Sequence, residues 1–302
     1  MSVIRVESLS KTFGNIQAVK DLSFEVPQGS IYGFLGQNGS GKSTTIRMLL
    51  SLIHPTSGNI HLFGKNLRDH RQSVISKIGA VIERPDLYPY LTAYEHLLFF
   101  AKLGSQKISI QKIEDILKKV GLFHRKNDKV GKYSLGMKQR LGIGIALVND
   151  PDLIILDEPT NGLDPNGIAD IRNLIKMLSK QEGKTIFISS HLLTEIEQIA
   201  DHILIIHEGS KIAEGSMESL FDPQKSLIQI SSTNDQQTRK KLEQSDFQKW
   251  MMPTETLSME LPSEILPKLH SYLIDSGVEL LGIERKNSLE DHFLRLTSKK
   301  SL

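Results

Sequence analysis

The chain has 302 residues, enough for one large domain or two smaller ones, and its 37 basic and 35 acidic side chains nearly balance. This balance gives no basic surface for nucleic acid, and the absence of cysteine excludes a disulfide scaffold. With neither a signal-peptide pattern nor an apolar run of about 18 residues, the chain is expected to lie in the cytoplasm.

Strand and helix patterns alternate along the first 216 residues. The run IYGFL at 31–35 is short, apolar and close to glycines, as a buried strand should be. In chain order we predict strands at 31–35, 77–82, 152–157 and 184–189, helices at 44–53, 110–120 and 166–180, and a hairpin at 203–216. Such alternation predicts a mainly parallel sheet covered by helices. The stretch from about 90 to 148 interrupts the alternation, which indicates an inserted helical subdomain.

The character of the chain changes after residue 216. Short strand patterns at 226–232 and 256–262 are followed by helical patterns at 264–277 and 288–296, and no catalytic motif is present. We therefore predict two domains, 1–216 and 217–302, the second being a small α+β appendage.

The stretch G-Q-N-G-S-G-K-S at 36–43 matches the phosphate-binding loop pattern between a strand and a helix. Its glycines let backbone N–H groups curl around phosphates, Lys42 adds a positive charge, and Ser43 offers a hydroxyl to Mg²⁺. A glycine-rich turn that only starts a helix is the alternative. The predicted nucleotide-binding residues here are Gly36, Gln37, Asn38, Gly39, Ser40, Gly41, Lys42, Ser43 and Thr44.

The strand L-I-I-L-D at 153–157 ends in two successive acids, Asp157 and Glu158. Beside a phosphate loop, Asp157 is expected to hold Mg²⁺, and Glu158 is expected to orient or deprotonate the attacking water. A strand that ends in two solvated acids is the alternative interpretation, and the phosphate loop disfavours it.

A third motif, Y-S-L-G-M at 133–137, begins a helix whose Gly136 stands 17 residues before Leu153. A helix start favours an anion, although an ordinary capped helix has the same pattern. The order of the three motifs resembles the ATP-binding-cassette (ABC) family, whose signature is commonly L-S-G-G-Q. Ser134 and Gly136 match and the other three positions depart. The resemblance implies that Ser134 and Gly136 bind the γ-phosphate of ATP held by an opposing subunit.

Further matches extend the resemblance over about residues 1–216. Asp164, in N-G-L-D, matches the family's S-A-L-D loop, and His191 matches the switch histidine that contacts the γ-phosphate. Phe13 stands where an aromatic residue stacks on adenine, and it keeps the stacking face. The resemblance implies an α/β fold with a P-loop NTPase (RecA-like) core, an inserted helical subdomain and a small α+β C-terminal appendage.

One position departs from the family in an informative way. Where the family usually has a glutamine that touches Mg²⁺, the stretch KIGAVIERPDLYPYLT has Glu83, a charged oxygen ligand. This stretch resembles the corresponding stretch of the bacitracin-resistance and lantibiotic-immunity subgroup, in which a glutamate replaces the glutamine. Local variation without substrate meaning is the alternative.

The resemblance implies an ATPase that uses ATP and Mg²⁺, with Glu158, His191 and Glu83 in catalysis and Ser43, Asp157 and Glu83 at the metal. Because one chain has one phosphate loop and one signature, a complete site requires a head-to-tail pair, either a homodimer or two related ATPase subunits. The chain would then drive a separate integral membrane permease from the inner face of the cell membrane, and expel peptide antibiotics. Nucleic acid is not expected as a partner.

Other ATPases carry similar motifs. A DNA-repair or chromosome ATPase usually separates its motifs by a long coiled coil, whereas Lys42 and Asp157 are only 115 positions apart here. Translation ATPases of this family carry two cassettes in one chain. A module that binds ATP without hydrolysis is disfavoured by Glu158 and His191, and an exporter of another cargo stays open.

Overall fold

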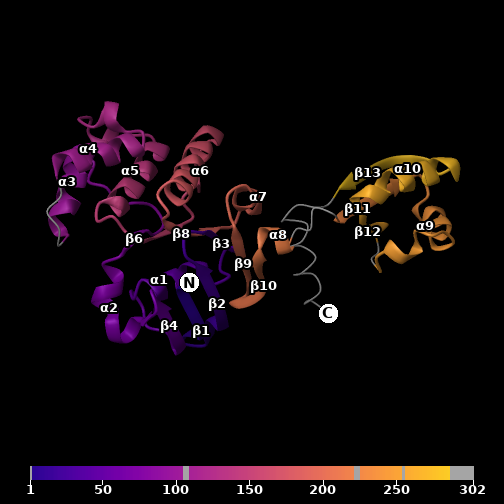
Figure 1. The fold of residues 1–302 in the computed structure, drawn as a ribbon, viewed down its shortest axis with the longest axis horizontal. Coiled ribbons are helices and arrows are strands. Elements are labelled where there is room, and N and C mark those ends of the chain that lie inside the picture. Colours follow the sequence, from indigo (N-terminus) through magenta and orange to yellow (C-terminus); the bar gives the residue numbers. More distant parts are fainter. Residues whose placement is uncertain (1, 105–108, 221–224, 254–255, 286–302) are drawn as a thin grey trace. The chain divides into compact units, whose positions relative to one another are not determined.

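The computed structural model of the chain describes residues 2–104, 109–220, 225–253 and 256–285. It divides into two compact units, Met1–Gly215 and Ser216–Leu302, whose elements are labelled in Figure 1. The helix predicted at 288–296 lies outside the described residues.

A six-stranded sheet forms the centre of the first unit. Its strands are β3 (Ile31–Leu35), β6 (Ile78–Val81), β7 (Leu153–Asp157), β8 (Thr185–Ser190), β9 (His202–His207) and β10 (Ser210–Ser216), in the order β10-β9-β3-β8-β7-β6. From β9 to β6 all neighbours are parallel. All residues of β3, β7 and β8 are buried, which is why these strands are short and largely apolar in sequence. The predicted α/β fold is confirmed.

Parallel strands bring their carboxyl ends to one edge of the sheet. Here β3 leads into α1 (Lys42–Leu49), and β7 leads to α6 (Pro165–Lys180). The strand β8 leads to α7 (Leu193–Glu197), and β6 leads to the segment that precedes α3 (Ala93–Leu103). The motifs that the sequence separates by more than a hundred residues therefore lie on neighbouring strand ends.

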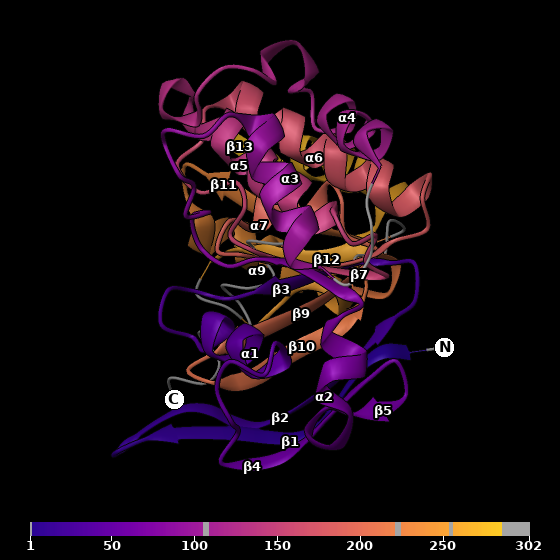
Figure 2. The same cartoon turned by 90° about the vertical axis from the view of Figure 1, so that its left-hand side faces the viewer.

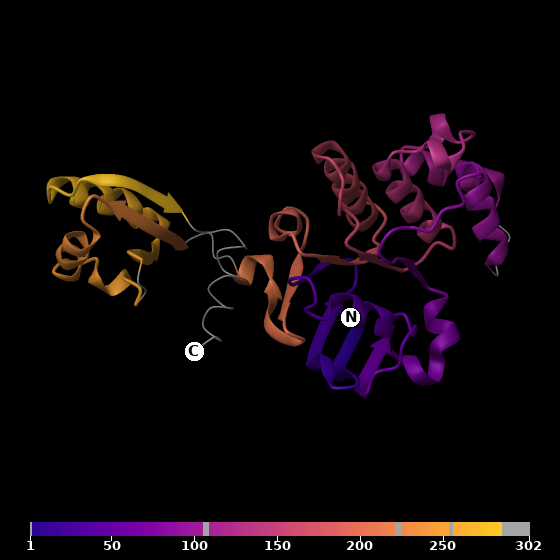
Figure 3. The same ribbon diagram turned by 180° about the vertical axis from the view of Figure 1, so that it is seen from behind.

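Three helices form a group of their own. The helix α3 packs against α4 (Ile110–Lys119) and α5 (Leu135–Leu147), and α5 also contacts β6. Figures 1 and 3 show this group on the opposite side of the six-stranded sheet from β1 and β2. Apolar side chains at helical spacing, such as Ile113, Ile116 and Leu117, are buried on one face of α4.

A second, antiparallel sheet was not predicted from the sequence. Its strands are β1 (Ser2–Phe13), β2 (Ile16–Pro27), β4 (Ser57–Leu62) and β5 (Lys65–Asn66), followed by α2 (Leu67–Ile75). Register shifts interrupt the β1–β2 pairing, so the alternation that reveals a strand is broken in the sequence. Phe24 of β2 stacks on Tyr32 and Phe34 of β3 with ring centroids 6.0 and 6.1 Å apart. Figure 2 shows β1, β2 and β4 together along one edge of this unit.

The second unit has a core of its own. A three-stranded sheet in the order β12-β11-β13 is built from β11 (Lys225–Ser232), β12 (Ser258–Pro262) and β13 (Leu280–Arg285). The helices of this unit are α8 (Met217–Leu220), α9 (Asp235–Glu243) and α10 (Leu266–Asp275). Ile228, Met259 and Leu269 are fully buried in its core, on which Trp250 and Met251 pack. The predicted strand and helix patterns that fall on described residues here are confirmed.

Candidate nucleotide site

The loop between β3 and α1 contains the first group of predicted site residues. Gly41 is the N-cap of α1 and has a φ of 103°, and no side chain caps the helix. The first N–H groups of α1 therefore point outward without an intrahelical partner, which favours an anion. Residues 37–39 are exposed, Ser43 and Thr44 are partly exposed, and Ser40, Gly41 and Lys42 are buried.

Gly41 also lies against the amino-terminal hairpin. A Cβ atom at this position would stand 2.5 Å from the Ala18 carbonyl oxygen of β2. We expect Gly41→Ala to lower the free energy of unfolding by more than about 2 kcal/mol, because strain at positive φ is added to a backbone clash. Urea denaturation measures this loss.

The matched control is Gly39→Ala. Gly39 also has a positive φ, of 79°, but a Cβ there would meet nothing within 4 Å. This variant should lose only about 1 kcal/mol, the cost of the dihedral itself. Equal losses in the two variants would show that the contact with Ala18 has no effect on stability.

The ammonium group of Lys42 is held by contacts within the protein. It donates to the carbonyl oxygens of Gly36 and Gln37 at 2.7 and 3.2 Å. It also lies 3.3 Å from Oε1 of Glu158, and the side chain is only 5% exposed. The end of β7 and the phosphate loop are thus joined by a charged contact.

The acidic pair lies where β7 meets β8. The strand register sets Asp157 opposite Ser189, and the Ser189 hydroxyl donates to Asp157 Oδ1 at 2.6 Å. The N–H of Glu158 donates to the same serine oxygen at 2.9 Å. The second oxygen of Asp157, Oδ2, is buried without a hydrogen-bond partner. Ser189 is a site residue that sequence reasoning missed, although its place at the end of the strand before His191 was a usable signal.

Glu158 contacts both His191, another predicted catalytic residue, and Lys42 of the phosphate loop. Its Oε2 lies 2.9 Å from Nδ1 of His191 while its Oε1 faces Lys42, and its φ is 48°, in the left-handed region. Asn161 Nδ2 also donates to Oε2, at 3.4 Å. A non-glycine residue in this backbone conformation is uncommon and must be held by its surroundings. The carboxylate is therefore oriented by three side chains.

The signature motif begins α5. Ser134 is the N-cap, its hydroxyl accepts from the Met137 N–H at 3.2 Å, and the residue is exposed. A Cβ at Gly136 would stand 3.9 Å from both Leu163 Cδ2 and Gly167 Cα. Among the described residues no hydrogen bond or ion pair joins Ser134 or Gly136 to the phosphate loop. The structure therefore places the helix start beside the 162–167 loop.

Asp164 and Tyr133 have structural contacts on either side of this helix start. Asp164 is the N-cap of α6 and accepts from the Gly167 N–H at 2.9 Å. Tyr133, which sequence reasoning left without a role, is 5% exposed and donates to the Arg125 carbonyl at 2.6 Å. Burial raises the pKa of the Tyr133 hydroxyl, so it stays a donor at neutral pH. The tyrosine that stands here in place of leucine thus adds a partly buried hydrogen bond.

Two predicted residues lie at the margins of the site. Glu83 follows β6 with a φ of 57°, and its Oε1 pairs with Arg47 Nη2 of α1 at 2.6 Å. Phe13 ends β1 and is 48% exposed, with the Lys11 ammonium 4.9 Å from its ring centroid. Its partner in the hairpin is Ile16, two residues from the Ala18 that approaches the phosphate loop.

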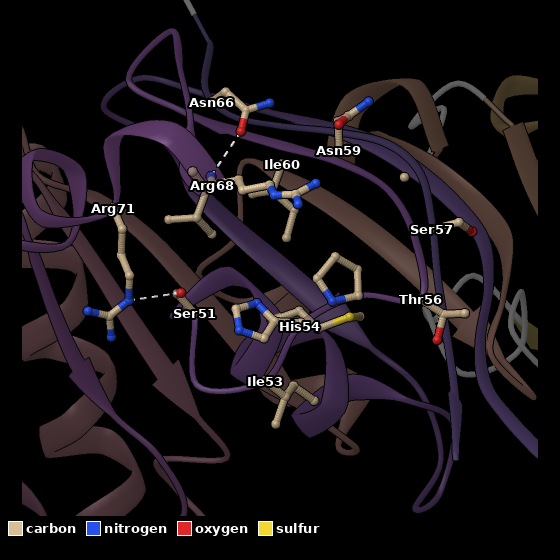
Figure 4. Close-up of a pocket in the computed structure, with 14 residues that line it drawn as sticks. Ser51, Ile53, His54, Thr56, Ser57, Asn59, Ile60, Asn66, Arg68 and Arg71 are labelled. Atoms are coloured by element: carbon tan, nitrogen blue, oxygen red, sulfur yellow. Dashed lines mark hydrogen bonds between the residues drawn. The ribbon is translucent and has the colours of Figure 1, made fainter. Parts of the chain in front are cut away.

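One cavity of the first unit lies apart from these residues. It measures about 470 Å³, lies between α1, β4 and α2, and includes none of the predicted site residues. Figure 4 shows the Arg71–Ser51 hydrogen bond at its edge and the hydrogen bond from the Arg68 backbone to Asn66. The nucleotide motifs instead lie at the carboxyl ends of the parallel strands β3, β7 and β8.

A phosphate loop, an acidic strand end and a histidine on adjacent parallel strands define a P-loop nucleoside triphosphatase. The ABC transporter family model matches residues 19–161. The bacitracin transport ATP-binding protein BcrA of Bacillus licheniformis is 43% identical over 303 residues, covering 98% of this chain and 97% of the relative. The lantibiotic transport ATP-binding protein SrtF of Streptococcus pyogenes is 43% identical over 229 residues, covering 74% and 97%.

Solved structures agree with this likeness. The cassette cbiO1 of Clostridium perfringens has a TM-score of 0.67 and 27% identity, covering 81% of this chain and 96% of its own. The dimeric cassette MJ0796, bound to ADP and phosphate after hydrolysis, has a TM-score of 0.64 and 27% identity, covering 71% and 98%. The chain therefore belongs to the ABC transporter family, as an ATP-binding subunit that hydrolyses ATP. Within the described parts of the chain, none of the helices has the length and apolarity to cross a membrane.

Proposed function

We propose that this chain hydrolyses Mg-ATP in a head-to-tail pair and drives a separate membrane permease. The permease would expel peptide antibiotics, and bacitracin is the favoured cargo. The main observation that supports this proposal is the 43% identity to the bacitracin transport protein over 98% of this chain. The lantibiotic relative is equally identical but covers only 74% of it. The longer match includes the second unit, which favours bacitracin.

The residues at the sheet edge fit Mg²⁺. Asp157 offers a buried oxygen without a hydrogen-bond partner, and Ser43 adds a hydroxyl in the first turn of α1. Among the described residues no group of three or more metal-ligating side chains is gathered, so phosphate oxygens and water would complete the coordination. When bound, the ion offsets negative charge on the phosphates.

The remaining residues act on the nucleotide. Lys42 moves its ammonium from Glu158 and the loop carbonyls to the phosphates, and Phe13 stacks on the adenine ring. Glu158 then accepts a proton from the attacking water, oriented by its contact with His191. The histidine would hold the γ-phosphate through Nε2–H, which requires a proton on both ring nitrogens because Nδ1 faces the Glu158 carboxylate.

The opposing subunit completes each site. The exposed Ser134 and the partly exposed Gly136 at the start of α5 lie next to the loop that carries Asp164, so both motifs approach the partner's γ-phosphate together. ATP closes the pair because its γ-phosphate is the group that both halves bind, and hydrolysis removes that bridge. The dimeric relative supports pairing.

The permease contacts the segment between β6 and α3. A groove of about 460 Å³ is lined there by residues 84–89, Val130 and Lys138. Arg84 and the exposed Tyr88 belong to this segment, and Tyr90 beside it is 63% exposed. The chain would thus lie on the inner face of the cell membrane, bound through the permease.

The test of this function is the antibiotic susceptibility of cells with and without the chain and its permease. We expect protection against bacitracin that disappears in Glu158→Gln, with weaker or no protection against lantibiotics. A Nod factor export protein is 35% identical over 98% of this chain, so another cargo has a concrete precedent among the relatives. Unchanged sensitivity with intact ATPase activity would discard the antibiotic role and keep the transporter ATPase.

Glu83 gives a separate prediction. In Glu83→Gln we expect the Mg²⁺ concentration for half-maximal hydrolysis to rise about threefold to tenfold, because an amide is a weaker ligand than a carboxylate. The amide oxygen retains the hydrogen bond to Arg47. The control Arg47→Gln removes the ion pair and keeps the carboxylate. Equal Mg²⁺ dependence in wild type and Glu83→Gln would assign Glu83 to the Arg47 contact alone.

A further inference from the structure

His96 is a fully buried histidine on α3, outside the nucleotide site. Its Nδ1 lies 2.9 Å from the Thr92 carbonyl oxygen, one turn earlier in the chain. Its Nε2 accepts from the Tyr88 N–H, also at 2.9 Å. Both ring nitrogens are therefore used by the backbone, and the second bond reaches out of the helix to the preceding segment.

The partners fix the state of the ring. A carbonyl oxygen is only an acceptor, so Nδ1 must carry the proton, and an amide N–H is only a donor, so Nε2 must be bare. The imidazole is thus neutral, with a single tautomer that satisfies both contacts. Thr92 O already accepts the helical bond from the His96 N–H at 3.0 Å, whereas the Tyr88 N–H has the histidine as its partner. Removing the imidazole would therefore leave the Tyr88 N–H without this hydrogen-bond acceptor.

The segment held by His96 and the helix α3 together present three exposed aromatic side chains, Tyr88 and Tyr90 from the segment and Phe99 from the helix. Tyr88, Tyr90 and Phe99 are 42%, 63% and 41% exposed. The Tyr88 ring lies 5.8 Å from Tyr90, 6.0 Å from Phe99 and 5.9 Å from the His96 ring, centroid to centroid. We call Tyr88, Tyr90 and Phe99 the aromatic surface. Its centre is the residue whose backbone is bonded to His96.

The same segment is tied to the chain that leads into the signature motif. The Gly131 N–H donates to the Pro89 carbonyl and the Val130 N–H to the Leu91 carbonyl, both at 2.9 Å. Three residues after Gly131 comes Ser134, the N-cap of α5. A displacement of residues 88–91 would therefore pull on the backbone next to the signature helix.

We propose that His96 is a positioning residue: its neutral ring fixes Tyr88 so that the aromatic surface is preformed for an apolar segment of the permease. This proposal rests on the proposed function, because it assigns the aromatic surface to the permease contact. Preforming the surface lowers the cost of ordering it on binding. The bonds at Gly131 and Val130 connect that surface to Ser134.

Hydrogen exchange at the Tyr88 amide of the full chain tests the bond. His96→Asn retains a donor for Thr92 but is too short to reach Tyr88, whereas His96→Gln places an amide oxygen near the position of Nε2. We expect the Tyr88 amide to exchange about tenfold faster in His96→Asn and within about threefold of wild type in His96→Gln. Amides of β7 serve as the internal control for global stability. Unchanged Tyr88 exchange in His96→Asn would overturn the proposal.

Co-purification with the co-expressed permease tests the consequence. His96→Asn should reduce the recovered complex several-fold and His96→Gln should restore it. Reduction in Tyr88→Ala/Tyr90→Ala, without reduction in His96→Asn, would overturn the role of His96 while keeping the permease contact. If the double tyrosine variant recovered as much complex as wild type, the aromatic surface would not contact the permease, and that part of the proposed function would be wrong. The two failures are therefore distinguishable.

Discussion

Replacing Glu158 with glutamine should lower ATP turnover by about 100-fold or more while leaving ATP binding within a few-fold of wild type. The amide keeps the shape of the side chain and can still contact Lys42 and His191, but it does not accept a proton from water. Single-turnover hydrolysis and equilibrium ATP binding measure the two effects separately. In the presence of ATP, the dimer of the Glu158→Gln chain should also accumulate, because the γ-phosphate that joins the two subunits is no longer removed.

Glu195→Gln is the matched control. Glu195 lies close to the same loop and accepts from the Thr160 hydroxyl at 2.5 Å, without a contact to Lys42 or His191 among the described residues. Its turnover should stay within about twofold of wild type, as expected for substitutions outside the catalytic groups. Wild-type turnover in Glu158→Gln would mean that another group takes the proton.

Mixing two inactive variants should restore hydrolysis if each site is shared between two chains. Lys42→Ala removes the phosphate-loop half, and Gly136→Asp brings a negative charge to the signature half. In a head-to-tail heterodimer one site retains both intact halves, so a random mixture should reach about a quarter of wild-type turnover. Steady-state ATPase activity of co-expressed, mixed chains measures this.

The control mixture combines Lys42→Ala with Asp157→Ala. Both residues belong to the same half, joined at the sheet edge where Lys42 contacts Glu158. Neither site of a heterodimer is then intact, so turnover should stay at the level of the single variants. The first mixture could stay as inactive as the control mixture. The head-to-tail arrangement would then be wrong, or hydrolysis at one site would require the second site to be intact as well.

Local sequence patterns determined the nucleotide half of the site. The apolar strands ending at Leu35 and Asp157 were recognisable because strands buried on both faces need apolar residues throughout. The phosphate loop was recognisable from the spacing of its glycines, lysine and serine between a strand and a helix. These features depend on residues close together in the chain, and the sequence displays them directly.

Contacts between distant segments were decided by the tertiary structure. The register of β7 and β8 set Ser189 opposite Asp157, and it brought His191 to Glu158. The bulged pairing of β1 and β2 hid a sheet whose Phe24 packs on β3. Packing of the segment before α3 set the Tyr88 N–H on Nε2 of His96, a contact that no pattern in the sequence displays. Hydrophobic periodicity reports which face of an element is buried, but the partner atom depends on how elements far apart in sequence pack together.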